Sequence, residues 1–146
     1  MNLLKNVKVD QILGYYAAGV TKRTTDIIDM ANYDGVMFVF ELGTIIEAGT
    51  IDCYVEQNTA NSTSGMARLA TTTAYTVTAT TAALAKSAIV VDVYQPGKRY
   101  LQANITPATQ NAVILGVTAI RYSARMKPEA NAALLKNTQL VSPAEA

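Results

Sequence analysis

The sequence predicts an all-β domain built from antiparallel strands. Several segments of strand length are β-branched or alternate apolar with polar residues, which is the period-2 pattern of a strand. Turn residues separate these segments, and few stretches have the length or the spacing of a helix. Eighteen threonines among 146 residues add to the β-propensity. A chain of this length suits one domain with a sizeable core.

The β-domain is expected to span residues 24–128, with an N-terminal arm over residues 1–23 and a C-terminal tail over residues 129–146. The predicted strands are residues 24–29, 36–42, 50–57, 75–80, 89–94, 98–105 and 111–125.

The arm is apolar and weakly periodic. Asp10 is able to cap a short helix, because apolar residues recur at helical spacing after it, whereas Gly14 counts against a helix. An extended arm that lies over a neighbouring subunit with Tyr15 and Tyr16 fits this segment equally well.

The first half of the β-domain contains its most regular patterns. Residues 24–29 alternate weakly and are expected at a sheet edge, and residues 32–35 form a turn in which Asp-Gly supplies a positive φ. Residues 36–42 are almost continuously apolar, which predicts a central strand with both faces covered. Residues 50–57 alternate cleanly. The inward residues are Ile51, Cys53 and Val55, and the outward residues are Asp52, Tyr54 and Glu56.

The middle of the chain is rich in threonine and serine. Residues 58–65 are small, polar and unpatterned, which predicts a mobile loop. Residues 75–80 alternate Tyr, Val and Ala with Thr and are expected to form a strand, and residues 82–86 are expected to form one helical turn. Cys53 is the only cysteine, so an intrachain disulfide is not available.

Three strands within residues 87–128 surround the turn Gln95-Pro96-Gly97-Lys98. Pro96 and Gly97 favour the two central positions of a turn, so the chain is expected to reverse there. With no helix between the three strands, we expect an antiparallel meander. Pro128 suits the first position of a short helix over residues 129–136. The tail after it is expected either to dock on another chain or to fray.

Charge is scarce and unevenly distributed. Charged residues make up 16% of the chain, whereas about a quarter is usual, and the net charge is +1. Residues 24–67 hold seven carboxylates and no cation, and residues 93–128 hold five cations and no carboxylate. These halves either face different ways, which would orient association, or pair internally across strands. A charge-poor, threonine-rich surface is inexpensive to cover and favours an assembly subunit.

The residues needed for common chemistry are missing. Histidine is absent, which removes the commonest general base and transition-metal ligand. No zinc, phosphate-loop, dinucleotide or nucleophile-elbow pattern occurs, so we expect no enzymatic activity and no cofactor. The chain lacks a signal-peptide pattern and an apolar run of membrane-spanning length. We therefore expect neither a membrane nor a nucleic acid as partner.

The order of several short strings resembles a known family. The strings are Asp29-Met30, Tyr33-Asp34-Gly35-Val36, residues 43–57, Val90-Val91-Asp92-Val93-Tyr94 with Pro96, Lys98-Arg99-Tyr100-Leu101, Thr109 with Asn111-Ala112, and Arg125 with Lys127-Pro128. Together they resemble the small head decoration proteins of tailed bacteriophages, also called cement or auxiliary capsid proteins. The resemblance covers roughly residues 27–128.

The resemblance implies an antiparallel β-sandwich of jelly-roll character and a role in the virion. Such proteins assemble as homotrimers on the outer surface of the icosahedral capsid after synthesis in the host cytoplasm. They bind the major capsid protein between capsomers and stabilise the shell. The candidate contact residues for the shell or for other subunits are Lys98, Arg99, Arg121, Arg125, Lys127, Tyr15 and Tyr16.

Other classes remain open from the sequence. Another virion β-barrel subunit, of a head-completion or tail-tube ring, would close a ring with the same strands. A carbohydrate-binding sandwich usually exposes aromatic residues, and the chain has no Trp. A nucleic-acid-binding domain would interleave cations with aromatics, as Arg99-Tyr100 and Arg121-Tyr122 do, yet it would also carry a larger positive charge.

Overall fold

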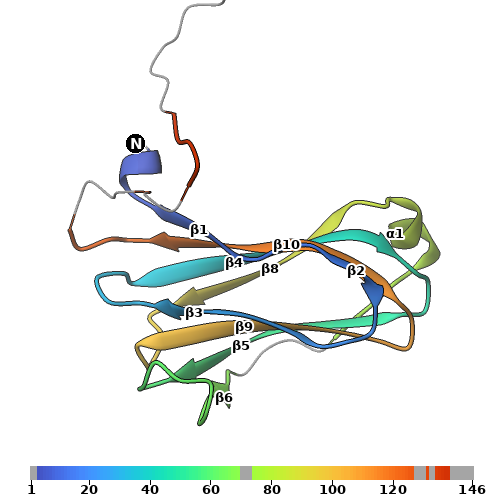
Figure 1. Ribbon diagram of the computed structural model, residues 1–146, viewed down its shortest axis with the longest axis horizontal. Helices are drawn as coiled ribbons and strands as arrows, with labels where there is room; N and C mark the ends of the chain where they lie inside the picture. The colour runs from blue at the N-terminus through green and yellow to red at the C-terminus, as the bar shows by residue number, and fades with distance from the viewer. Residues whose placement is uncertain (1–2, 70–73, 127–130, 132–133, 139–146) are drawn as a thin grey trace, which may run out of the picture.

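The computed structural model describes residues 3–69, 74–126, 131 and 134–138. In this part of the chain two antiparallel sheets pack face to face, as Figure 1 shows. Sheet A comprises β1 (Lys8–Leu13), β2 (Tyr16–Gly19), β4 (Gly35–Ile45), β8 (Ser87–Tyr94) and β10 (Ala112–Tyr122). Sheet B comprises β3 (Arg23–Asp29), β5 (Thr50–Asn58), β6 (Ala67–Arg68), β7 (Tyr75–Thr76) and β9 (Tyr100–Ala108).

The strand order is that of a jelly roll. Sheet A runs β1-β10-β4-β8, with β2 beside β10 on the same side as β1, and sheet B runs β3-β9-β5-β6, with β7 also paired to β5. If β1 with β2 and β6 with β7 are each counted as one interrupted strand, the orders become 1-8-3-6 and 2-7-4-5. Eight strands in two sheets joined by crossovers between the sheets are the jelly-roll arrangement. The predicted all-β sandwich of jelly-roll character is confirmed.

The predicted meander over residues 87–128 is wrong. β8 pairs with β4 in sheet A, β9 lies between β3 and β5 in sheet B, and β10 returns to sheet A beside β4 and β1. The loop at Pro96 and Gly97 therefore crosses from one sheet to the other. The positive φ of this loop, 50°, belongs to Gln95 and not to Gly97.

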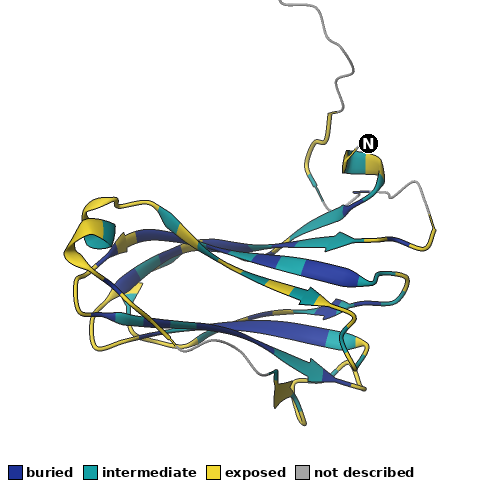
Figure 2. Cartoon of the chain, turned by 180° about the vertical axis from the view of Figure 1, so that it is seen from behind, coloured by how far each residue is buried: buried dark blue, intermediate teal, exposed yellow. Residues whose placement is uncertain are grey.

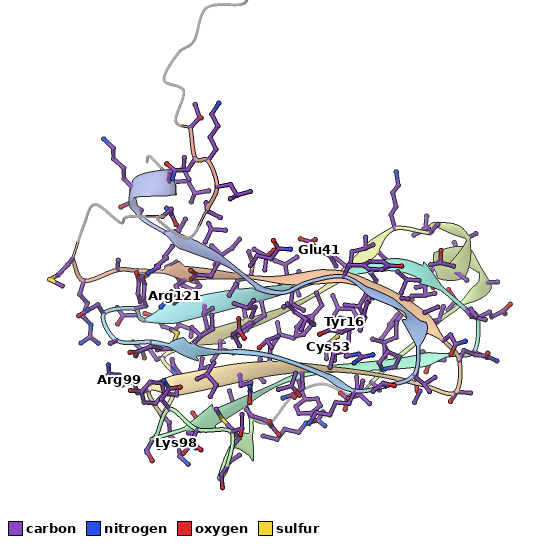
Figure 3. The ribbon with its side chains drawn as sticks, in the orientation of Figure 1. Tyr16, Glu41, Cys53, Lys98, Arg99 and Arg121 are labelled. Atoms are coloured by element: carbon purple, nitrogen blue, oxygen red, sulfur yellow. The ribbon has the colours of Figure 1, made fainter. Side chains whose placement is uncertain are left out.

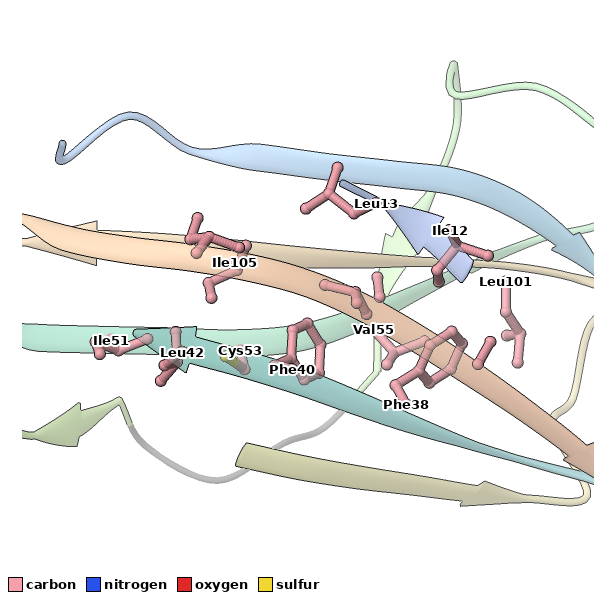
Figure 4. Packing of buried hydrophobic residues seen from close by; sticks show 14 of the residues in the cluster. Ile12, Leu13, Phe38, Phe40, Leu42, Ile51, Cys53, Val55, Leu101 and Ile105 are labelled. Atoms are coloured by element: carbon pink, nitrogen blue, oxygen red, sulfur yellow. The ribbon is translucent and has the colours of Figure 1, made fainter. Parts of the chain in front are cut away.

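The core lies between the sheets (Figures 2 and 4). On β4 the inward residues Val36, Phe38 and Phe40 are fully buried, whereas the outward residues between them are half-buried. The expectation that both faces of this strand are covered is therefore met on one face only. On β5 the predicted inward residues Ile51, Cys53 and Val55 are confirmed. On β9 the inward residues are Leu101, Ala103 and Ile105.

The N-terminal segment contributes strands to the sandwich. The helix expected from Asp10 is wrong, because residues 8–13 pair with β10 as β1 and residues 16–19 pair with it as β2. The ladder is interrupted at Gly14 and Tyr15. A single 3₁₀ turn, η1 (Leu3–Lys5), precedes β1. Sheet A thus has its first edge strand from the segment expected to be an arm.

The threonine-rich middle departs from its prediction for a local reason. The expected strand over residues 75–80 ends at Thr76, and α1 (Ala79–Ala83) follows it, three residues before the expected helical turn. Thr78 caps α1. Its hydroxyl accepts a hydrogen bond from the Thr81 amide, and the Thr81 hydroxyl accepts one from the Thr78 amide. This reciprocal capping stabilises a helix where alternation alone favours a strand.

The C-terminal tail touches its own chain. Asn131 is buried, and its side chain accepts from the Val9 amide at 2.8 Å and donates to the carbonyls of Leu4 and Val7 at 3.2 Å. The described residues 131 and 134–138 are not helical, so the helix expected over residues 129–136 is absent from them. The rest of that prediction, and the extended tail after residue 138, lie outside the described residues.

Candidate interaction surfaces

One end of the sandwich gathers the turn before β4 and the loop between β8 and β9. Residues 30–34 and 95–99, together with Arg125, line a cleft of about 370 Å³ there. Gly35 is required at this end because Tyr122 packs over it: a Cβ at Gly35 would lie 2.2 Å from the Tyr122 ring. The predicted positive φ at the Asp34-Gly35 turn belongs instead to Asn32, at 71°.

Arg99 stands on this end and forms a bidentate ion pair with Asp29 (Figure 3 labels Arg99). The two hydrogen bonds measure 2.8 and 2.7 Å. They hold the pKa of Asp29 below its ordinary value and raise the pKa of Arg99. Both side chains remain about half exposed, so the pair is accessible from solvent.

Arg121 is buried near the same end, between the sheets. Its guanidinium donates to the Asp10 carboxylate at 2.6 Å and to the Asp29 carbonyl at 2.7 Å, and it lies over the Tyr33 ring at 4.8 Å. The side chain is 11% exposed. Arg121 therefore ties sheet A to sheet B and is not placed for contact with a partner.

Arg125 and Lys98 also line the cleft at this end. Arg125 is 72% exposed and donates to Asp34 at 3.1 Å. Lys98 is half-buried, and its amide donates to the Gln57 side chain at 3.1 Å. Lys127 lies outside the described residues.

The acidic and basic halves of the sequence therefore meet in three dimensions. Two of the four ion pairs among the described residues, Arg99 with Asp29 and Arg125 with Asp34, join a carboxylate from residues 24–67 to a cation from residues 93–128. Of the two alternatives predicted from the charge distribution, these two ion pairs agree with internal pairing of the acidic and basic segments. This end presents neutralised arginines and not a bare basic patch.

The two N-terminal tyrosines differ in exposure. Tyr15 is 65% exposed at the interruption between β1 and β2. Tyr16 packs against the core, and the Arg23 guanidinium lies over its ring at 4.1 Å. Figure 3 shows Tyr16 between the two sheets. Tyr15 alone is placed to touch another molecule.

The outward side of sheet A is a broad apolar surface, here called outer face A. It consists of the residues that alternate with the buried ones on β1, β4, β8 and β10. They are Val9, Gln11, Met37, Val39, Glu41, Ala88, Val90, Asp92, Tyr94, Val113, Leu115, Thr118, Ile120 and Tyr122. Its only charged members are Glu41 and Asp92.

Several side chains of outer face A lie open to solvent. Val90, Leu115 and Tyr94 are 53%, 44% and 61% exposed. The Tyr94 and Tyr122 rings are parallel at 6.5 Å, and the Tyr122 hydroxyl donates to Asp92 at 2.8 Å. Burial and this bond raise the pKa of Tyr122 to about 12. Exposed apolar side chains therefore lie on both β8 and β10 of this face.

The outward side of sheet B, here called outer face B, is polar and internally paired. Thr24 donates to Asn104 at 2.8 Å, and Asn104 donates to Glu56 at 2.9 Å. Arg68 forms a bidentate pair with Asp52 at 2.9 Å and lies over the Tyr54 ring. Lys22 also lies over that ring, at 5.3 Å. Asn104 is completely buried by these neighbours although it points away from the core.

Outer face A was missed by sequence reasoning. Part of the signal was present in residues 36–42, where Met37 and Val39 are apolar on the side opposite Val36, Phe38 and Phe40. That pattern predicted a strand with both faces covered and not a surface. Only the strand order shows that the outward apolar residues of four strands lie side by side.

The described residues hold no group of three or more His, Cys, Asp or Glu side chains suited to a metal ion. Within the same ranges, none of the helices is both long and apolar enough to cross a bilayer. Cys53 is buried on β5, and burial raises the pKa of its thiol to about 12.

The fold and its surfaces define a jelly-roll protein with one apolar and one polar outer face. Comparison with known proteins adds little to this class. No family model matches the chain, and no curated protein matches it. Among solved structures the chain is similar to dimeric latent PorU from Porphyromonas gingivalis, with 12% identity and a TM-score of 0.44. The similarity covers 80% of this chain and 12% of PorU, so the chain spans a small part of that protein.

Proposed function

We propose that this protein is a structural component of a bacteriophage virion that decorates and stabilises an icosahedral capsid. It binds the major capsid protein between capsomers, on the outer surface of the shell, and acts as a homotrimer. Its work is the burial of surface, and many copies on one lattice add their contacts through multivalency.

Outer face A is the observation that supports this proposal. A sheet whose outward side carries two charges and a wide set of apolar side chains has surface available for a partner. The described part of the chain contains no metal-binding cluster that would indicate a different kind of site. The resemblance in short strings to head decoration proteins names the partner.

The arginine end has a smaller role in this proposal than the sequence implied. Arg99 and Arg125 already hold carboxylates of their own chain, so a carboxylate on the shell would compete with Asp29 and Asp34. Exposed ion pairs exchange partners at little cost, so this end is suited to adjust the orientation of binding more than its strength.

The test is to add the purified protein to undecorated capsids and to measure occupancy. Leu115→Glu places a charge on outer face A. We expect it to lower the affinity for capsids at least about tenfold, because the carboxylate must lose its water when the contact forms. Ala108→Glu is the matched control, since Ala108 is an exposed residue at the end of β9 on outer face B. It should bind as the unchanged protein does.

Each result has a distinct meaning. A protein that ignores capsids altogether contradicts the proposed function. Equal binding by both variants contradicts the use of outer face A. If the occupancy of capsids by Arg99→Glu does not change at raised salt, electrostatic attraction does not contribute to binding. The mass of the purified protein in solution tests the trimer.

A further inference from the structure

The edges of the two sheets differ in how their free backbone groups are protected. An edge strand presents unpaired amides and carbonyls that can pair with another chain, and proteins usually shield them with bulges, charges, proline or a covering segment. Three of the four edges in the described part of this chain carry such a shield.

The β1 edge of sheet A is covered. The Asn131 side chain accepts from the amide of Val9 and donates to the carbonyls of Leu4 and Val7, so this residue occupies backbone groups at this edge. The edge is also interrupted at Gly14 before β2 begins.

Both edges of sheet B are also blunted. β3 has an irregular register between Thr24 and Ile27, and Asp26 within that irregularity carries a charge. On the other side of the sheet, β6 and β7 are two residues each, which is too short to template a partner strand.

The β8 edge of sheet A has Asp92 as its one charge and, among the described residues, no bulge, proline or covering segment. β8 pairs with β4 over eight consecutive residues without a register shift, and it contains neither proline nor lysine. Among the described residues, its backbone forms no hydrogen bond outside the ladder with β4. A groove of about 310 Å³, lined by Val55, Leu69 and residues 91–97, lies beside the second half of this strand.

We propose that the β8 edge pairs in antiparallel orientation with β8 of a second copy of this chain. The proposal goes beyond capsid binding and does not depend on it. One charge within β8 and one charge directly before it specify this partner. Lys86 and Asp92 are the two charged residues of this segment, and each lies three residues from Ile89.

Antiparallel pairing about Ile89 satisfies both charges at once. It places Lys86 of each copy opposite Asp92 of the other, and Ala88 opposite Val90. All four residues are exposed, and Ala88, Val90 and Asp92 lie on one side of the strand. The contact is isologous, because the same edge serves both copies, and opposite charges and β-branched pairs across strands stabilise it.

The symmetry of the contact limits where it acts. A two-fold contact cannot close a ring of three, so in a trimeric protein it would join subunits of neighbouring trimers and not subunits within one trimer. It would then link decorated positions across the shell.

The experiment measures self-association of the full chain by sedimentation over a range of concentrations, without capsids. Lys86→Asp is the main variant, because it leaves the hydrogen bond from Tyr122 to Asp92 in place. We expect it to weaken the two-fold step, monomer to dimer or trimer to trimer pair, by roughly tenfold, since two attractive pairs become repulsive. Asp92→Lys should do the same, and the charge-swapped double variant should restore association.

Asp26→Lys, at the shielded β3 edge, is the control and should associate as the unchanged protein does. Hydrogen exchange supplies a second readout: the amides of β8 should exchange more slowly at high protein concentration, and Lys86→Asp should abolish this protection.

The proposal is overturned if the mass and the β8 exchange of the unchanged protein do not depend on concentration. It is also overturned if the double variant stays dissociated, if Asp26→Lys weakens association equally, or if β8 becomes protected only when capsids are added. The last result would assign the edge to the capsid protein. Because no capsid is needed for the main measurement, its failure leaves the proposed function standing.

Discussion

The two outer faces of this sandwich differ in how their side chains are covered. Outer face B covers its polar groups with one another, through the chain of hydrogen bonds from Thr24 through Asn104 to Glu56. Outer face A leaves Val90 and Leu115 in solvent. Its Glu41 accepts one long hydrogen bond, 3.4 Å, from Thr118.

The difference shows where stability and where association reside. A buried, satisfied polar network is costly to break, because each group that loses its partner remains desolvated. Exposed apolar side chains contribute little to folding and become valuable only when another molecule covers them. Face B therefore contributes to the fold of the single chain, whereas the apolar side chains of face A gain value only under the proposed function, in which another molecule covers them.

The largest expected effect concerns the layer that both faces enclose. Cys53 lies on the inward side of β5, between Asp52 and Tyr54 of outer face B. Because burial raises the pKa of its thiol to about 12 from 9.0, the thiolate fraction near pH 8 falls roughly a thousandfold. A thiol reagent should modify the native protein at least that much more slowly than the protein in urea. Rapid labelling of the folded chain would mean that the space between the sheets opens readily.

The next effect tests the polar network of outer face B. Asn104→Leu removes the partner of both Thr24 and Glu56 in a fully buried position, and it should lower the free energy of unfolding by about 1–3 kcal/mol. Urea denaturation measures it. The matched control is Thr118→Leu on outer face A, which should change stability by less than about 0.5 kcal/mol. Similar losses from both variants would erase the contrast between the faces.

A smaller effect tests outer face A itself. Replacing Leu115 and Ile120 together by Thr should change the free energy of unfolding by less than about 0.5 kcal/mol. Thr is β-branched and suits a strand, and both positions are on the outward side of the sheet. The same variant should bind capsids more weakly. A loss of stability as large as that of Asn104→Leu would place this surface in the fold of the single chain.

The smallest effect is the ion pair of Arg99 with Asp29. Both side chains are about half exposed, so solvent screens the pair and its contribution to stability is small. Since the folded pKa of Asp29 is lowered, this contribution is present above the ordinary carboxyl pKa of 3.8 and is lost as the pH falls through the folded value. The stability difference between the unchanged protein and Asp29→Asn should therefore shrink from pH 6 to pH 2. If this stability difference stays constant from pH 6 to pH 2, the ion pair between Arg99 and Asp29 is not its cause.

Strand positions were predicted where burial is one-sided. Alternation over residues 50–57 identified the inward residues of β5, because a period of two follows directly from the pleat of a strand. The prediction failed where side chains compete for the backbone. At the start of α1, hydrogen bonds of the Thr78 and Thr81 hydroxyls cap the helix. The pattern of apolar residues does not reveal these hydrogen bonds.

Strand partners were not predictable from neighbouring segments. β8, β9 and β10 follow one another closely, yet each crosses to the other sheet, because the ladder is formed with strands distant in sequence. The candidate cations show the same limit. Their separation from the carboxylates along the chain was visible, but the pairing of Arg99 with Asp29 joins residues 70 positions apart.

The amino-acid sequence by itself determined the all-β class, the inward residues of the central strands and the scarcity of reactive side chains, since these follow from local periodicity and composition. Tertiary structure alone decided which outward residues share a face, which charges neutralise each other and which edge is left unshielded. Those properties depend on strands meeting across the sandwich, and the physical forces that pair them act between residues that the linear order keeps far apart.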